Sequence, residues 1–214
     1  MKKILVLIFS FITLCGNSQL KYIGLTGGTT FANQKWKFKP LDVTQRMNYK
    51  IGGNGSLYTE WGNHEAFTWI FEGQYNQKGA RGTDLISGNS FTSKTDYLSL
   101  NILLKLRADF NLGAPYIFAG PSAEYLFSQT GAPVGFSPLN ISILLGAGYD
   151  FYISNFIVPF VEGIYNPSFT RMINNETYAV RGKAWGIKAG IKFRRGAGKR
   201  GPRNRHNDCP PVYL

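Results

Sequence analysis

Cysteine and histidine are scarce in this sequence, which holds two of each. The cysteines are Cys15 and Cys209, and the first lies in an N-terminal segment with the pattern of a secretory signal. Cleavage of that signal leaves a single cysteine, so an internal disulfide cannot stabilise the exported chain. The fold must be stabilised in another way, and closure of a β-sheet into a barrel is one.

The apolar run at the N-terminus is too short for a transmembrane helix. Two lysines precede this run, which covers 4–14, whereas a helix needs about 20 apolar residues to cross a bilayer. The run fits the apolar region of a signal peptide, and Gly16 and Ser18 supply small residues at −3 and −1. We therefore predict a signal peptide at 1–18. A lipoprotein signal at Cys15 is the weaker alternative, because the residue before it is leucine rather than a small residue.

Acidic residues are half as common as basic ones, 12 against 24, and the formal net charge is +12. The excess is concentrated in the signal and in 194–214, which holds six basic residues and one acidic residue. The body is only mildly basic, which together with export argues against nucleic acid as a partner. The segment 194–214 is rich in Arg, Gly and Pro, so we predict a disordered periplasmic tail. This tail is either a solvated extension or a segment that binds an acidic partner or anionic lipid headgroups.

Sustained helical periodicity is absent after residue 19, and alternation with a period of two replaces it. In the clearest segment, Trp185, Ile187 and Phe193 share one face, and Lys188 and Lys192 lie on the other. Eight segments show this pattern with varying clarity, approximately over 22–31, 49–61, 67–76, 97–106, 116–127, 140–151, 156–165 and 184–193. Each has about ten residues, the length that a tilted strand needs to cross a membrane. We predict an all-β, eight-stranded, antiparallel up-and-down transmembrane β-barrel over 19–193.

The predicted connections alternate strictly between short and long. Short turns fall near 62–65, 108–114 and 152–155, and longer loops near 32–48, 77–95, 128–138 and 166–182. Outer-membrane barrels have tight periplasmic turns and longer outer loops, whereas a soluble sandwich has no reason to sort its loops in this way. We therefore expect the chain in the cell outer membrane, as a monomeric barrel surrounded by outer-membrane lipid.

Charged residues fall on the faces that we assign to the lumen. They are Glu60, Glu72, Glu124, Asp150, Glu162, Lys50, Lys105, Lys188 and Lys192. A Lys or Arg that faces lipid near the midplane costs about 2–4 kcal/mol, and an eight-stranded barrel is just wide enough for its own side chains. We expect ion pairs that plug the lumen. Two prolines, Pro121 and Pro159, lie inside strands and predict bulges, because proline cannot donate to the ladder.

With the strands placed, the chain resembles the PorT-like outer-membrane β-barrel family common in Bacteroidetes. The resemblance covers about 22–193 and rests on QYNQKG at 74–79, YLSLN at 97–101, PYIFAGP at 115–121, GAG at 146–148 and EGIY at 162–165. The chain departs from the family at Asn101, where proline is frequent, and in the tail after Phe193. The resemblance implies a barrel in the outer membrane. Most members have no assigned activity, and the namesake serves a protein-secretion system.

Candidate chemical sites are weak. His64 lies in a predicted turn without the serine partner that a lipid hydrolase needs near the outer leaflet. The trio His206, Asp208 and Cys209 lacks the spacing and number of ligands of a zinc site. The stretch GAGK at 196–199 lacks the Ser or Thr and the first Gly of a phosphate-binding loop. The stretch Gly53-Asn54-Gly55 is equally weak as a nucleotide signal.

The lumenal carboxylates Glu72, Glu124 and Glu162 have an alternative interpretation as acid/base catalysts. We favour an ion-pair network that balances Lys105 and Lys188. Apolar faces carry aromatic residues that have an alternative interpretation as ligand-stacking platforms, and that the girdles at the membrane interfaces explain more simply: Trp61, Trp69, Tyr75, Tyr97 and Trp185. We therefore assign no catalytic, cofactor-binding or metal-binding residue and expect no enzyme activity and no cofactor.

Three functions are compatible with this pattern, and an enzyme barrel is a fourth and weaker alternative. The first is a structural or interaction barrel, whose loops or basic tail contact envelope proteins in secretion or envelope assembly. The second is a small-solute pore, which a filled lumen disfavours. The third is a secreted lipocalin-like binder of an apolar ligand, whose apolar faces would point inward.

Overall fold

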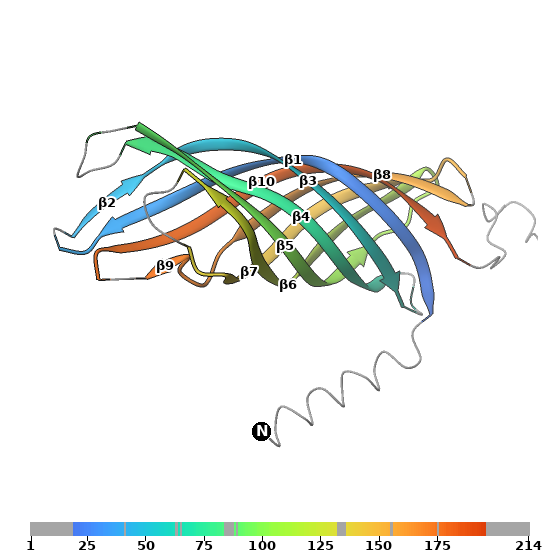
Figure 1. The fold of residues 1–214 in the computed structure, drawn as a ribbon. Coiled ribbons are helices and arrows are strands. Elements are labelled where there is room, and N and C mark those ends of the chain that lie inside the picture. Colours follow the sequence, from blue (N-terminus) through green and yellow to red (C-terminus); the bar gives the residue numbers. More distant parts are fainter. Residues whose placement is uncertain are drawn as a thin grey trace, which may run out of the picture.

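Ten β-strands form in the computed structural model, which describes residues 19–195 except 41, 63, 65, 84–87, 89, 132–135, 155 and 175. Eight long strands build the barrel in Figure 1: β1 (Leu20–Phe38), β3 (Asn48–Trp61), β4 (Phe67–Thr83), β5 (Ser90–Arg107), β6 (Gly113–Thr130), β7 (Leu139–Phe151), β8 (Ile157–Pro167) and β10 (Tyr178–Arg194). They pair antiparallel in chain order, and β1 pairs with β10 from Tyr22↔Arg194 to Phe38↔Tyr178. This last pairing closes the sheet, so the predicted eight-stranded up-and-down barrel is confirmed.

Two short strands, β2 (Val43–Arg46) and β9 (Ile173–Asn174), continue the sheet at one end of the barrel (Figure 1). The β2 strand pairs with β1 beyond the start of β3, and β9 pairs with β10 beyond the end of β8. Each interruption holds a methionine, Met47 between β2 and β3 and Met172 just before β9. Both methionines are buried, so these breaks turn large side chains into the barrel.

The long loops of the sequence prediction are in large part strand. Strand β4 continues to Thr83 and β5 begins at Ser90, so most of the predicted loop 77–95 is paired, as is much of 32–48 and 166–182. The prediction failed because the segments beyond the bilayer have lost the apolar alternation but keep their backbone pairing. The turns at 62–66, 108–112 and 152–156 are short as predicted. We call the end with these turns the short-turn end and the opposite end the long-loop end.

The two faces of the sheet differ in polarity in the sense opposite to that of a soluble barrel. Exposed large apolar side chains cover the outside, for example Ile51, Leu57, Leu100 and Ile117, each about 60–70% exposed. Acidic and basic side chains are buried inside, where Glu60 and Lys192 have no exposed surface. The lipocalin-like alternative is therefore wrong, because its apolar residues would point inward.

Proline does not distort the ladder as expected. Pro121 pairs in register with Ile143, and Pro159 pairs in register with Ile191. The irregularities of the sheet lie elsewhere, at Leu20/Tyr22, Tyr49/Asn54 and Asp96/Tyr97. The predicted bulges at the prolines are wrong. Opposite Pro121, the pairing of β5 with β6 omits Ile102 and Leu103, so the ladder tolerates the missing donor without a change of register.

Among the residues described, no helix is both long and apolar enough to cross a membrane. The predicted signal peptide at 1–18 and the tail from 196 onward lie outside the described residues. Strand β10 continues one residue beyond the predicted barrel end, to Arg194. The N–H of Arg195 then donates to the carbonyl of Lys21 at 2.9 Å.

Candidate functional site

The lumen contains many buried charged side chains, and these form three layers along the barrel axis. Alternation along each strand turns every second side chain inward, so charges from β3, β4, β5, β6, β7, β8 and β10 meet in a narrow space. Burial of such groups is tolerated only where each charge finds an opposite charge and hydrogen-bond partners.

The layer nearest the short-turn end is a quartet of two acids and two lysines. Lys192 Nζ lies 2.5 Å from Asp150 Oδ2 and 3.3 Å from Glu60 Oε2, and Lys105 Nζ lies 3.2 Å and 3.5 Å from the same two oxygens. Lys105 Nζ also lies 3.6 Å from the centroid of the Tyr116 ring, a cation–π contact. All four charged residues are buried and their formal charges cancel.

The middle layer joins β4 to β10 across the lumen. Lys188 Nζ lies 2.6 Å from Glu72 Oε1, and Glu72 accepts further hydrogen bonds from the Ser56 hydroxyl and the Asn101 amide. Glu162 faces Lys188 across the β8–β10 ladder but forms no ion pair within the described residues. Its carboxylate accepts a hydrogen bond from the Tyr116 hydroxyl at 2.8 Å.

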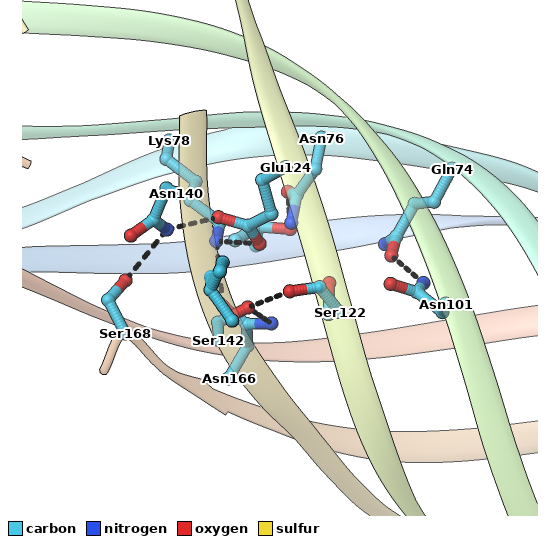
Figure 2. A network of polar contacts seen from close by, with 12 residues as sticks. Gln74, Asn76, Lys78, Asn101, Ser122, Glu124, Asn140, Ser142, Asn166 and Ser168 are labelled. Atoms are coloured by element: carbon cyan, nitrogen blue, oxygen red, sulfur yellow. Dashed lines mark hydrogen bonds and ion pairs between the residues drawn. The ribbon is translucent and has the colours of Figure 1, made fainter. Parts of the chain in front are cut away.

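The third layer lies toward the long-loop end and centres on Lys78 (Figure 2). Lys78 Nζ donates to Glu124 Oε1 at 2.6 Å and to Asn166 Oδ1 at 2.7 Å. The Asn140 amide donates to the other oxygen of Glu124 at 2.6 Å, and the Asn166 amide donates to the Ser142 hydroxyl at 3.0 Å. One lysine therefore ties β4, β6 and β8 together through the centre of the barrel.

Apolar side chains fill the space between the charged layers. One buried cluster comprises Tyr58, Ile70, Leu103, Tyr116, Phe118, Leu144, Phe160 and Ile164. Inward-facing glycines make room for its rings, since a Cβ on Gly146 would lie 2.2 Å from Phe118 Cζ and one on Gly190 would lie 2.6 Å from Phe160 Cζ. A cavity of about 10 Å³ between Glu72, Glu162 and this cluster has room for about one water molecule.

A second apolar cluster caps the lumen at the long-loop end. Its buried members are Trp36, Met47, Ala80, Tyr97, Phe136, Met172, Ile173 and Val180, and Phe91 and Leu126 pack against them. The Trp36 ring makes edge contacts with Phe91 and Phe136, whose centroids lie 5.6 Å and 6.4 Å away. Both methionines at the strand interruptions take part, so the irregular backbone at this end builds the cap.

The predicted lumenal charges are buried inside except for Lys50, and two further buried charges were not predicted. Lys50 is only half-buried at the long-loop end, where Gly79 packs near its side chain. Lys78 and Asp96 are buried but were missed, because Lys78 lies in the predicted loop 77–95 and Asp96 lies between that loop and the predicted strand at 97–106. Tyr97 is fully buried in the cap, so its assignment to the aromatic girdle is wrong.

The partners of the carboxylates also differ from those expected. Of the three carboxylates expected to balance Lys105 and Lys188, only Glu72 pairs with one of them, Lys188. Glu124 pairs with Lys78, and Lys105 pairs with Glu60 and Asp150. Each catalytic candidate except Glu162 is thus held by a buried lysine. His64 lies in the first short turn, where its carbonyl accepts a hydrogen bond from Lys21 Nζ at 2.6 Å. The trio His206, Asp208 and Cys209 and the stretch 196–199 lie outside the described residues, and no group of metal ligands occurs within them.

The short-turn end exposes apolar residues beside a small polar cluster. Tyr152 donates a hydrogen bond from its hydroxyl to Asp109, which also pairs with Arg107 Nε at 3.2 Å. Partial burial, and then the hydrogen bond to Asp109, raise the pKa of Tyr152 above its ordinary value. The Tyr152 N–H donates to the carbonyl of Leu112 at 3.2 Å, so the second and third turns pack together. Their tips expose Phe110, Leu112, Ile153 and Phe156, each about 60–85% exposed.

Comparison with known proteins supports the fold and not a specific activity. The sequence matches no protein-family model and no curated protein. Among solved structures, it is similar to Neisserial surface protein A, with 11% identity and a TM-score of 0.53, covering 84% of this chain and 99% of that one. It is also similar to the outer membrane protein OprG of Pseudomonas aeruginosa, with 12% identity and a TM-score of 0.54, covering 83% and 97%.

These neighbours are eight-stranded outer-membrane barrels, and this chain has their fold. The apolar exterior independently requires lipid around the strands, because exposure of so many large apolar side chains to water is unfavourable. Fold and exterior together place the chain in the outer membrane.

Proposed function

We propose that this chain is a PorT-like outer-membrane barrel that acts through contacts with other envelope components and neither catalyses a reaction nor conducts solutes. The observation that carries the proposal is the filled lumen. Three layers of buried charges, all of them in ion pairs except Glu162, occupy the described interior together with the apolar cluster between them and the cap. The inward side chains therefore close the lumen, and the surfaces that can contact other molecules are the outside of the barrel, the turns and the loops.

The interaction role draws support from the short-turn end. Phe110, Leu112, Ile153 and Phe156 gather on two packed turns, beyond the strand ends at Arg107 and Phe151. Exposed apolar clusters with charged neighbours are typical of contact surfaces. The role in protein secretion or envelope assembly that the PorT-like resemblance implies fits a surface of this kind.

A small-solute pore is the second candidate, and one observation favours it. The hydroxyls of Ser93, Ser99 and Ser122 are buried toward the lumen and have no hydrogen-bond partner among the described residues. A hydrated path would satisfy them. Planar-bilayer recording of the reconstituted chain separates the two candidates. We expect no steady conductance, whereas a stable open state in the unmodified chain would contradict the closed barrel and favour the pore.

Photo-crosslinking in intact cells tests the contact surface. A crosslinking amino acid at Leu112 or Ile153 should trap a discrete partner, and one at Ala119 on the lipid-facing side of β6 should trap none. Because Leu112 and Ile153 are about 84% and 77% exposed, neither substitution disturbs the packing. Equal capture at all three positions would contradict a partner at the turns.

A further inference from the structure

We propose that the outside of β1 and β10, near the long-loop end, binds a lipid with a phosphorylated headgroup. Lys35 on β1 and Arg181 and Lys183 on β10 form a basic patch on this surface. Even-numbered residues of both strands, such as Gln34, Trp36, Val180 and Ala184, are buried inside. The three basic side chains therefore point outward, and all three are exposed.

The strand register places these like charges beside one another. Lys35 lies directly opposite Arg181, and Asn33 lies directly opposite Lys183. Side chains at opposed positions of an antiparallel pair have Cβ atoms about 4.5–5.5 Å apart, so like charges there destabilise the sheet. None of the three forms an ion pair with another described residue, whereas their neighbour Lys37 pairs with Asp42. An anion bound between them would remove the repulsion.

The patch lies immediately beyond an aromatic row on the same surface. Phe31 pairs with Trp185, Trp185 pairs with Tyr165, and Tyr165 pairs with Leu145. The centroids of the Tyr165 and Trp185 rings lie 4.5 Å apart. For strands tilted by about 40°, Lys183 lies about 5 Å and Lys35 about 10 Å farther along the axis than this row. Girdle aromatics sit at the level of the headgroups, and the polar layer on each side of a bilayer is about 5–8 Å thick, so flexible basic side chains at these positions can reach that layer.

A groove lies directly beneath the patch, on the lipid-facing side. Its volume is about 580 Å³, and Phe31, Leu145, Gly163, Tyr165, Trp185 and Ile187 line it. Gly163 forms its floor, since a Cβ at that position would meet nothing nearer than the Ala147 carbonyl oxygen at 4.0 Å. Basic groups above an apolar groove suit one molecule that has both a phosphate group and an acyl chain. A zwitterionic lipid fits less well, because its own cation would face the patch.

Quenching of Trp185 fluorescence measures lipid binding at this site, because Trp185 lines the groove and brominated acyl chains quench tryptophan fluorescence on contact. The chain is reconstituted in phosphatidylcholine vesicles that contain brominated phosphatidic acid or, in parallel, brominated phosphatidylcholine. The signal of a Trp185→Phe variant is subtracted to remove the other three tryptophans. Each basic residue near a membrane surface strengthens the binding of anionic lipid, so we expect at least a roughly tenfold preference for phosphatidic acid.

Two pairs of variants test the two halves of the site. Replacement of Lys35, Arg181 and Lys183 together by Gln should remove the preference, whereas Arg81→Gln with Lys94→Gln, on β4 and β5 at the same end, should keep it. Gly163→Leu fills the groove and should reduce quenching by phosphatidic acid severalfold. Gly73→Leu, at another outward glycine with open space around its Cβ position, should not.

Heat-modifiable migration on a gel confirms that each variant is folded. Equal quenching by the two lipids in the unmodified chain would overturn the proposal, as would a preference that survives loss of the three basic residues. Equal effects of Gly163→Leu and Gly73→Leu would remove the groove from the site. These measurements of lipid binding do not depend on whether the lumen conducts solutes, so they test this proposal separately from the proposed function.

Discussion

Lys188 on β10 and Glu72 on β4 form an ion pair across the lumen, with Nζ and Oε1 2.6 Å apart, although β1 and β3 separate their strands in the sheet. The pair links opposite parts of the wall, and the Ser56 and Asn101 side chains complete the hydrogen bonds of the carboxylate. A contact of this kind is a constraint on how the barrel closes, because neither residue can form it until the ring is complete.

The pair predicts a non-additive mutant cycle. Lys188→Met leaves Glu72 charged and buried, so we expect a loss of about 3–5 kcal/mol in the free energy of unfolding. The double variant Glu72→Leu/Lys188→Met should be more stable than Lys188→Met, since only Glu162, and not Glu72 as well, is then left without the lysine of this layer. Urea-induced unfolding of the barrel in vesicles measures all three. Additive losses in the double variant would show that the two charges do not depend on one another.

Glu162 serves as the matched control for this cycle. It forms no ion pair in the described structure, and a glutamine there can still accept the hydrogen bond from Tyr116. Glu162→Gln should therefore change the free energy of unfolding by about 1 kcal/mol or less. A loss as large as that of Lys188→Met would show that Glu162 depends as strongly as Glu72 on the charge of Lys188, which it faces across the β8–β10 ladder.

Glycines on the two faces of the sheet should respond oppositely to a side chain. Gly146 points inward, and its Cβ would lie 2.2 Å from Phe118 Cζ, whereas Gly73 points outward into open space. We expect Gly146→Val to destabilise the barrel by about 1–3 kcal/mol through overpacking, and Gly73→Val to leave its stability unchanged. The denaturant midpoints of unfolding test this, provided that the two variants have the same dependence of unfolding free energy on denaturant concentration. Similar midpoints would show that the lumen has room for the added side chain.

The sequence predicted the barrel well because lipid outside and a narrow lumen inside impose a strict alternation on each strand. Leu98 to Leu106 carry this pattern with few exceptions, and all of the outward residues in that segment are exposed or half-exposed. The lumenal side of β8 was also placed correctly despite Val158 and Phe160, which are buried inside with Glu162.

The features that the sequence missed lie where this constraint ends. Beyond the bilayer both faces of a strand can be polar, so the pairing of Lys78 to Thr83 with β5 gave no periodic signal. The partner of Glu124 was consequently unknown, and so was the cap, whose residues come from strands, interruptions and loops far apart in sequence. Spacing cannot predict which charges meet across a lumen, because every inward position can reach several others.

Orientation in the membrane follows from the lengths of the connections. We predict that the short turns, including Asn111, are periplasmic and that the loops around Lys37, Ser87, Gly131 and Asn174 face outside. In a Cys209→Ser background, a membrane-impermeant thiol reagent on whole cells should label Ser137→Cys and not Asn111→Cys. After the cells are lysed, both should react. Labelling of Asn111→Cys alone on intact cells would reverse the orientation.

Alkaline pH should act on the short-turn end through Tyr152. Its raised pKa means that the folded state holds the hydroxyl proton more tightly than the unfolded chain. This contribution to stability is complete below the ordinary tyrosine pKa of about 10 and is lost as the pH rises above it. Tyr152→Phe should remove part of the decline in stability between about pH 10 and 12. An unchanged decline would show that the hydrogen bond to Asp109 is absent in the membrane.

The end of the barrel gives the last prediction. Phe193 closes the apolar alternation, and the sequence therefore suggested that the fold ends there. The structure moves this limit, because β10 includes Arg194 and the N–H of Arg195 donates to the carbonyl of Lys21. Arg194 also donates a hydrogen bond to the Tyr22 hydroxyl at 2.9 Å, on the strand that closes the ring.

A chain that ends after Arg195 should therefore insert and fold, whereas a chain that ends after Phe193 should lose these contacts and be less stable by about 1–2 kcal/mol. Heat-modifiable migration and surface labelling of an outer loop measure insertion of both. In the full chain, we expect the basic segment beyond 195 to bind acidic partners rather than to support the fold. Salt should weaken these contacts, because exposed charges are screened over about 8 Å at physiological ionic strength. If the chain that ends after Arg195 fails to insert, the distal segment is required for assembly and the barrel domain does not end where its sheet ends.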